Sequence, residues 1–184
     1  MSDALRQEII DLPEVMAGHL SVSLAALAIG IGLAIPVGIL VHRAPATRAA
    51  ALAAASVVQT IPALAMLALM MPIFFALRHV WIEVRTTGFG PAVAALALYS
   101  VLPMLRNTVT GLAGVDPAAR EAGRALGMTP RQLLVKVELP LALPVIVAGV
   151  RTATVWVVGM ATLATLIGQP SLGTPIISGL HLQN

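Results

Sequence analysis

The sequence predicts an all-α protein that crosses a membrane about four times. Of its 184 residues, 58% are hydrophobic and 10% are charged, whereas a soluble domain has about a quarter of its residues charged. Its apolar runs reach or exceed the roughly 20 residues that one helix needs to cross a bilayer. Alanine and leucine dominate these runs, which lack the two-residue alternation of a membrane β-barrel.

Two spans are predicted in the N-terminal half. Residues 1–18 contain one arginine and four acidic residues, so they lack the positive start of a signal peptide and are expected to form an external segment. The first span is expected at about 19–41, where Gly30, Gly32, Ala34 and Gly38 would allow close helix packing. The second lies within 49–77, and Pro62 and Pro72 are expected to bend it or end it early.

Two further spans are predicted in the C-terminal half. One covers about 89–105 and the other lies within 141–168, so the transmembrane domain extends over 19–184. The loop 106–140 separates these two spans. Residues 168–184 form a tail that contains glycine and proline.

The basic residues predict the orientation. Loops 42–48 and 106–140 hold seven of them, whereas the opposite side holds three. The positive-inside tendency therefore places these two loops in the cytoplasm, and the N-terminus and the tail outside. Membrane topology also explains the net charge of +3 better than nucleic-acid binding does.

The sequence contains no cysteine, and its four histidines are scattered without a paired carboxylate. These features argue against a disulfide and against a metal site.

The cytoplasmic loop begins with a predicted short helix at 118–126. Asp116 suits the N-cap position and Pro117 suits the first helical position. Gly127 suits the left-handed position that follows many helices. Alanine and glycine give this helix a small face that another surface could approach closely.

A second short helix is predicted to begin directly after the first. Thr129 and Gln132 have the spacing of a capping box, in which each side chain satisfies a backbone N–H group of the other residue. The helix is expected to end near Pro140, where the fourth span begins. The loop would then consist of two capped helices joined at a glycine.

The loop also resembles a known motif. Glu121-Ala122-Gly123 is followed after three residues by Gly127, and nine residues later by Val137-Glu138-Leu139-Pro140. This spacing resembles the EAA loop of ABC importer permeases, with Gly123 in place of the usual alanine. The resemblance implies that an ATPase docks on the residues Glu121, Ala122, Gly123, Arg124 and Gly127.

Other stretches resemble the osmoprotectant branch of these permeases, which carries glycine betaine, choline or proline. The resemblance implies a multi-pass subunit of the bacterial plasma membrane that works by alternating access. Its implied partners are a second permease subunit, two ATPase subunits and an external substrate-binding protein. Permeases of this branch usually have one more span after the tail. The stretches are Gln59-Thr60-Ile61-Pro62, Leu102-Pro103, Arg106-Asn107-Thr108, Ala148-Gly149-Val150-Arg151-Thr152-Ala153-Thr154 and Ile167-Gly168-Gln169-Pro170-Ser171-Leu172-Gly173.

The sequence predicts a transporter subunit and not an enzyme. A phosphate-binding loop needs Gly-Lys-Ser/Thr, and the single lysine, Lys136, follows Leu-Leu-Val. No cofactor is expected in this chain, and a partner ATPase would bind ATP and magnesium.

Polar residues within the spans are candidates for the translocation path. A charge on Arg151 near mid-membrane costs about 3 kcal/mol, so it should face protein or water. Arg151, Thr152 and Thr154 could line or gate the passage. The favoured alternative is structural, with Arg151 bonding carbonyls freed by Pro140 and Pro144 or a facing helix terminus.

Gln59 and Thr60, just before Pro62, form a second candidate group for the path. The alternative role for them is an interhelical hydrogen bond. Trp156 is expected to be packed among the helices. With aromatics at 3%, the chain is not expected to build an aromatic cage, so tight recognition of a quaternary ammonium group would reside in the binding protein.

Two alternative functions remain open. The same machinery could import methionine or another amino acid. An intramembrane hydrolase would need a serine and a histidine facing each other, but Ser56, Ser100 and His19 show no spacing that implies this.

Overall fold

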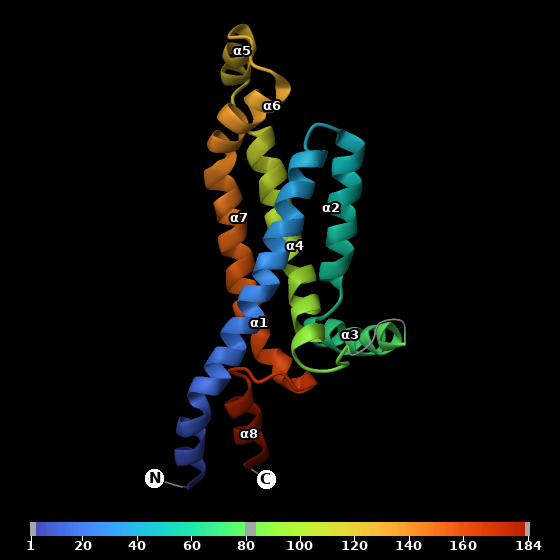
Figure 1. The fold of residues 1–184 in the computed structure, drawn as a ribbon, viewed down its shortest axis with the longest axis vertical. Helices are drawn as coiled ribbons and strands as arrows, with labels where there is room; N and C mark the ends of the chain where they lie inside the picture. The colour runs from blue at the N-terminus through green and yellow to red at the C-terminus, as the bar shows by residue number, and fades with distance from the viewer. Residues whose placement is uncertain (1–2, 80–83, 183–184) are drawn as a thin grey trace.

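The computed structural model describes residues 3–79 and 84–182, and the side chains of residues 10–79 and 84–180. All regular elements in this part of the chain are helical, and together they form an elongated bundle (Figure 1). In chain order they are α1 (Asp3–Val41), α2 (Pro45–Thr60), α3 (Ala63–Arg78), α4 (Phe89–Ala113), α5 (Pro117–Ala125), α6 (Pro130–Leu133), the π-helix η1 (Leu134–Glu138), α7 (Leu139–Met160), the 3₁₀-helix η2 (Ala161–Ile167) and α8 (Thr174–Leu182).

Three helical segments of the described chain are long and apolar enough to cross a membrane. They cover Ile10–Val41, Phe89–Ala113 and Pro130–Ile167. The last two are longer than the predicted spans 89–105 and 141–168, because the helices on both sides continue into the predicted loop 106–140 without a break in their hydrogen bonding. The α2–α3 pair makes a fourth crossing if the two helices count as one broken span. The predicted all-α fold with about four spans is therefore confirmed.

Helix α4 is the centre of the bundle. It packs most extensively against α1 and α7, and its span is the most buried of the three. Glycines allow the close approach of α1: a Cβ atom on Gly30 would lie 1.9 Å from the Ser100 hydroxyl oxygen, and one on Gly38 would lie 2.7 Å from a Thr108 methyl carbon. Small residues serve the same purpose at many helix contacts in membranes.

The second span breaks at Pro62. Helices α2 and α3 meet there at 100°, and α3 lies across the bundle (Figure 1). The expected effect of Pro62 is confirmed, because a proline between helices removes a backbone donor and fixes its own φ. Pro72 lies inside α3 and does not end it.

The helix that starts at Pro130 does not end near Pro140, so that prediction is wrong. In a regular α-helix the Pro140 ring would press on the carbonyl of Lys136. Instead η1 forms one wide π-helical turn, in which the Leu139 N–H group donates to the carbonyl of Leu134, five residues earlier. The helix then continues into the fourth span as α7.

The two ends of the chain are more helical than the sequence suggested. α1 begins at Asp3 and so includes most of the segment 1–18, and the tail after Gly168 contains α8. Both termini lie at the end of the bundle opposite α5 and α6 (Figure 1). His19 is buried near this end, where its Nδ1 accepts a hydrogen bond from the Leu172 N–H group at 3.4 Å.

Candidate functional site in the coupling loop and the spans

The first helix of loop 116–140, the coupling loop, starts and ends as predicted. The Asp116 carboxylate accepts a hydrogen bond of 2.8 Å from the Ala118 N–H group, and Pro117 is the first residue of α5. At the other end Gly127 has φ 75°, a conformation that favours glycine. The N–H groups of Gly127 and Met128 close the helix by donating to the carbonyls of Arg124 and Gly123, which is the Schellman pattern.

The predicted capping box of the second helix is also present. The Gln132 N–H group donates to the Thr129 hydroxyl at 3.3 Å, and the Thr129 N–H group donates to the Gln132 side-chain oxygen at 2.8 Å. The turn at Gly127 ends α5, and the capping box of Thr129 and Gln132 starts α6 three residues later.

The predicted docking residues divide into two groups. Glu121, Ala122, Arg124 and Gly127 are exposed on the coupling loop. Gly123 is buried, because a Cβ atom there would lie 2.6 Å from a Leu133 methyl carbon. Glycine at the third motif position therefore allows α5 to pack closely on the helix that follows.

The exposed face of α5 ends in an apolar side chain. Leu126 is 78% exposed, although leucine is usually found inside folded proteins. Leu126 therefore adds an apolar side chain to the exposed residues Glu121 and Arg124 of the coupling loop.

A buried carboxylate fastens the coupling loop to the spans. Glu138 is 3% exposed, and it accepts a hydrogen bond of 3.0 Å from Nη2 of Arg43 and one of 2.9 Å from Nε of Arg120. Arg43 follows α1, Arg120 lies on α5, and Glu138 lies in the π-helical turn before α7. We refer to these three residues as the Glu138 cluster.

Two further contacts extend the Glu138 cluster. Nη2 of Arg120 also donates to the carbonyl of Leu112 at 2.5 Å, which connects α5 to the last turns of α4. Nε of Arg43 donates to Nε2 of His42 at 3.2 Å, and His42 in turn bonds the carbonyl of Ile39 through Nδ1. One carboxylate thus links the ends of α1, α4, α5 and η1.

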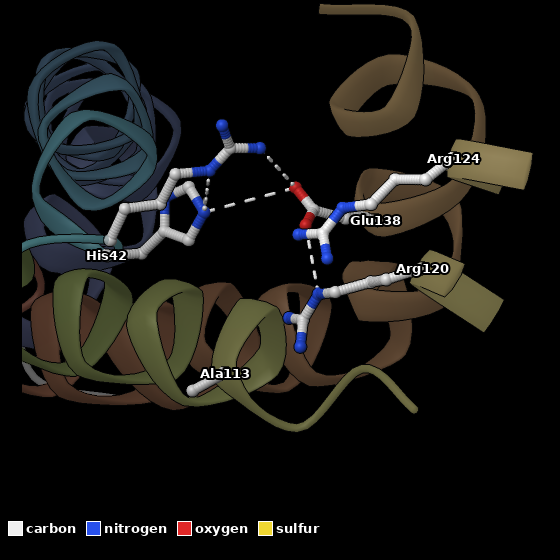
Figure 2. A pocket seen from close by; sticks show the side chains of 6 residues that line it. His42, Ala113, Arg120, Arg124 and Glu138 are labelled. Atoms are coloured by element: carbon white, nitrogen blue, oxygen red, sulfur yellow. Dashed lines mark hydrogen bonds and ion pairs between the residues drawn. The ribbon is translucent and has the colours of Figure 1, made fainter. Parts of the chain in front are cut away.

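The Glu138 cluster borders a hollow of about 340 Å³. The side chains of Arg120 and Arg124 both extend from α5 toward Glu138 (Figure 2). Burial alone raises the pKa of the Glu138 carboxyl, but the hydrogen bonds and charges of Arg43 and Arg120 lower this pKa below its ordinary value. Glu138 therefore stays ionised and holds both arginines.

A second, uncharged set of contacts lies within the spans. Pro103 has no N–H group, so it cannot satisfy the carbonyl of Tyr99 four residues earlier. The Gln59 side-chain amide donates to that carbonyl at 3.1 Å. The Tyr99 hydroxyl in turn donates to the carbonyl of Ile61, which lies between α2 and α3. We refer to this arrangement as the Gln59–Tyr99 pair.

The remaining candidate residues of the path differ in their surroundings. The Thr60, Thr152 and Thr154 hydroxyls donate to carbonyls of their own helices. Arg151 is exposed and forms no hydrogen bond or ion pair with the described residues. The expected bonds from Arg151 to carbonyls freed by Pro140 and Pro144 are therefore not formed in the described chain.

Sequence reasoning missed several residues of these sites. In the sequence Glu138 stands out only as part of the motif, although an acidic residue between apolar neighbours indicates a paired, buried carboxylate. No local pattern in the sequence connects Tyr99 with the helix breaks at Pro62 and Pro103. Trp156 was expected to be packed, but it is 52% exposed beside Thr152.

The hydrolase alternative lacks its geometry in the described residues. The hydroxyls of Ser56 and Ser100 donate to carbonyls within their own helices, and neither has a histidine partner. His19 contacts the tail instead. No group of three metal-binding side chains occurs in the described part of the chain.

Comparison with protein families identifies this architecture. Residues 26–184 match the model of the binding-protein-dependent transport system inner membrane component. The chain belongs to this family. It is therefore a permease subunit of an ABC importer, a multi-pass membrane protein and not the ATP-hydrolysing subunit.

Three named permeases align with most of this chain. It is 42% identical over 164 residues to the choline transport system permease protein OpuBB of Bacillus subtilis, covering 89% of the chain and 70% of the relative. It is 43% identical, with the same coverage, to the carnitine transport permease protein OpuCB of Listeria monocytogenes. It is also 43% identical over 159 residues to the osmoprotectant import permease protein OsmW of Salmonella typhimurium, covering 85% of the chain and 71% of the relative.

Solved structures share the fold of the permease. Inward-facing forms of the MetNI methionine ABC transporter match with a TM-score of 0.77 at 23% identity, covering 94% of this chain and 80% of the transporter chain. An amino acid ABC transporter crystallised with histidines matches with a TM-score of 0.75 at 21% identity, covering 99% and 85%.

Proposed function

We propose that this permease imports a quaternary-ammonium osmoprotectant, such as glycine betaine, carnitine or choline. The observation that carries the proposal is the 42–43% identity to relatives named for choline, carnitine and osmoprotectant transport. The methionine transporter shares only 23% identity with the chain, so it supports the fold and not the cargo. Methionine or another amino acid remains the second candidate cargo.

The proposed machine contains two permease subunits, two ATPases that bind ATP and magnesium, and an external binding protein. The ATPases would dock on α5 through Glu121, Arg124 and Leu126, which are exposed at the end of the bundle opposite both termini. This end also carries most of the basic residues outside the spans, which supports a cytoplasmic position.

The mechanism that we propose is alternating access driven through the Glu138 cluster. When the two ATPases close on ATP, each would move the α5 docked on it. Arg120 would pass this movement to Glu138 and so to α7, while Arg43 would carry it to the end of α1. Charged hydrogen bonds are stronger than neutral ones, so the helices that they connect can move together as rigid bodies.

Docking is tested by the variants Glu121→Lys and Leu126→Asp. Both change exposed side chains, so insertion and folding should be preserved. We expect co-purification of the ATPase to fall about tenfold, which corresponds to a loss of about 1.4 kcal/mol of binding free energy, because each variant places an opposite charge or a buried charge in the proposed interface. Arg85→Glu, an exposed charge reversal outside the coupling loop, should leave co-purification unchanged. Wild-type co-purification by both coupling-loop variants would refute this docking site.

The cargo is tested with the complete complex in proteoliposomes. Uptake of glycine betaine, carnitine and choline is compared with that of methionine in the presence of ATP. We expect ATP-dependent uptake of at least one quaternary-ammonium compound and none of methionine. The opposite pattern would establish the amino-acid alternative.

A further inference from the structure

The hollow of about 340 Å³ beside the Glu138 cluster has an excess of positive charge. Three guanidinium groups line it but only one carboxylate does, so two positive charges have no counterpart within the hollow. Concave surfaces of one charge sign concentrate the electric field and attract ions of the opposite sign. We refer to this space as the arginine hollow, and its lining residues are His42, Arg43, Ala113, Arg120, Arg124 and Glu138.

The single carboxylate of the hollow already has its partners. Oε2 of Glu138 accepts a hydrogen bond of 3.0 Å from Arg43, and Oε1 accepts one of 2.9 Å from Arg120. The His42 ring adds no positive charge, because its Nε2 accepts a hydrogen bond from Nε of Arg43 and so carries no proton. The excess charge therefore belongs to the arginines alone.

Most N–H groups of these arginines have no acceptor in the described chain. Arg124 forms no hydrogen bond or ion pair with the described residues, and its side chain extends from α5 toward Glu138 (Figure 2). A guanidinium group has five N–H donors, of which Arg43 and Arg120 each use two. The remaining donors are left for water or for an anion.

The position of the arginine hollow favours an anion that carries phosphate. The hollow lies where the membrane-crossing helices α1 and α4 end, at Val41 and Ala113. On the cytoplasmic side, which we propose for this end, anionic lipids attract basic residues next to the membrane. Phosphate oxygens also accept the forked N–H groups of arginine in parallel pairs.

We propose that the arginine hollow binds an anionic phosphate group, supplied by a lipid headgroup or by free phosphate. Arg124 and the remaining N–H donors of Arg43 and Arg120 hold this group. Because Arg124 and Arg120 lie on α5 and Arg43 follows α1, the bound phosphate connects the coupling loop to the end of the first span. The site is independent of the cargo that the permease carries.

The experiment measures thermal unfolding of the complete complex in detergent at increasing concentrations of inorganic phosphate. Sodium chloride at the same ionic strength corrects for charge screening. We expect phosphate to stabilise the wild type, because a ligand that binds the folded state raises its stability. In Arg124→Gln the phosphate concentration that gives half of the stabilisation should rise about tenfold, the scale of one lost charge-assisted hydrogen bond.

A second variant tests the hollow without changing α5. Ala113→Glu places a carboxylate on an exposed residue that lines the hollow, so it should occupy the arginines and abolish the response to phosphate. Arg131→Gln is the matched control. Arg131 is an exposed arginine of the coupling loop that does not line the hollow, so this variant should respond as the wild type does. ATPase co-purification confirms that each variant assembles.

Two lipids distinguish the sources of the phosphate group. Phosphatidylglycerol or phosphatidylcholine is added to the complex in place of inorganic phosphate. Stabilisation by phosphatidylglycerol that is lost in Ala113→Glu identifies a lipid headgroup, and stabilisation by inorganic phosphate alone identifies free phosphate.

Two results would overturn the phosphate site. The first is a wild type that neither phosphate nor phosphatidylglycerol stabilises, which is the result expected if an acidic side chain of the docked ATPase fills the hollow. The second is an equal response of the wild type, Arg124→Gln and Ala113→Glu, which would mean that phosphate acts elsewhere on the complex.

Discussion

The Glu138 cluster and the Gln59–Tyr99 pair solve the same problem with different chemistry. Each holds helices together next to a proline that interrupts regular hydrogen bonding, Pro140 in one case and Pro62 with Pro103 in the other. The first uses a carboxylate and two guanidinium groups at the coupling-loop end. The second uses a neutral amide and a neutral hydroxyl within the spans.

The difference follows from the free-energy cost of burying a charged group, which is lower at the coupling-loop end than within the spans. At the coupling-loop end the Arg43 side chain is 49% exposed, so water supports its charge while the buried Glu138 binds it. Within the spans an ion would lose that support, whereas neutral groups can satisfy freed carbonyls at a lower cost. Charged hydrogen bonds are suited to the helix contacts that we propose move with the ATPase. Neutral hydrogen bonds are suited to the fixed bend between α2 and α3.

The largest effect is expected from Glu138→Gln, which removes the shared charge of the Glu138 cluster. Both arginines would lose their ion pair, and Arg120, with a side chain only 21% exposed, cannot fully recover its hydration. Breaking a buried ion pair from one side costs about 3 kcal/mol. We expect a clear fall in the thermal stability of the purified complex and a loss of ATP-coupled uptake of about tenfold or more.

Glu14→Gln is the matched control for this prediction. Glu14 is exposed on α1 and has no ion pair with the described residues, so the same chemical change should leave stability and uptake unaltered. If Glu138→Gln coupled ATP hydrolysis to uptake as the wild type does, the Glu138 cluster would not be part of the transmission.

A smaller effect is expected from Tyr99→Phe in the Gln59–Tyr99 pair. The change removes one hydroxyl and leaves the carbonyl of Ile61 without its donor, which costs about 1 kcal/mol in a partly buried site. Gln59→Leu should cost a similar amount through the carbonyl of Tyr99. The measurement is the thermal unfolding of the complex in detergent.

The double variant tests whether the Gln59–Tyr99 pair acts as a unit. Both bonds connect the end of α2 to α4, so their loss should be non-additive by more than about 0.5 kcal/mol. Ser56→Ala removes a hydroxyl that bonds only within α2 and should cost less. Simple additivity would show that the two proline breaks are held independently.

The two regions also differ in how far the sequence predicted them. The caps of the coupling loop depend on neighbours within a few residues, so Asp116, Thr129 and Gly127 could be recognised in the sequence and are confirmed. Apolar length similarly predicted the spans, because the bilayer sets a minimum number of residues.

The missed features depend on residues that lie far apart in the chain. Glu138 and Arg43 are 95 positions apart, and Gln59 and Tyr99 are 40 apart. No local pattern indicates which of several arginines meets one carboxylate. The π-helical turn at Pro140 was missed for a related reason, since a proline predicts strain but not how the helix relieves it.

The smallest expected effect separates the two chemistries by salt. Raising the ionic strength from about 0.1 M to about 1 M shortens the screening length from roughly 10 Å to 3 Å. The half-exposed Arg43 should then contribute less, so the stability lost in Arg43→Gln should shrink by about 0.5 kcal/mol at high salt, the scale of a partly exposed ion pair. The loss in Tyr99→Phe should not change, because it involves no charge. Thermal unfolding of both variants and the wild type at the two salt concentrations measures this. An equal change in both variants would mean that salt acts on the whole bundle, and the contrast between a charged and a neutral connection would then explain nothing about stability.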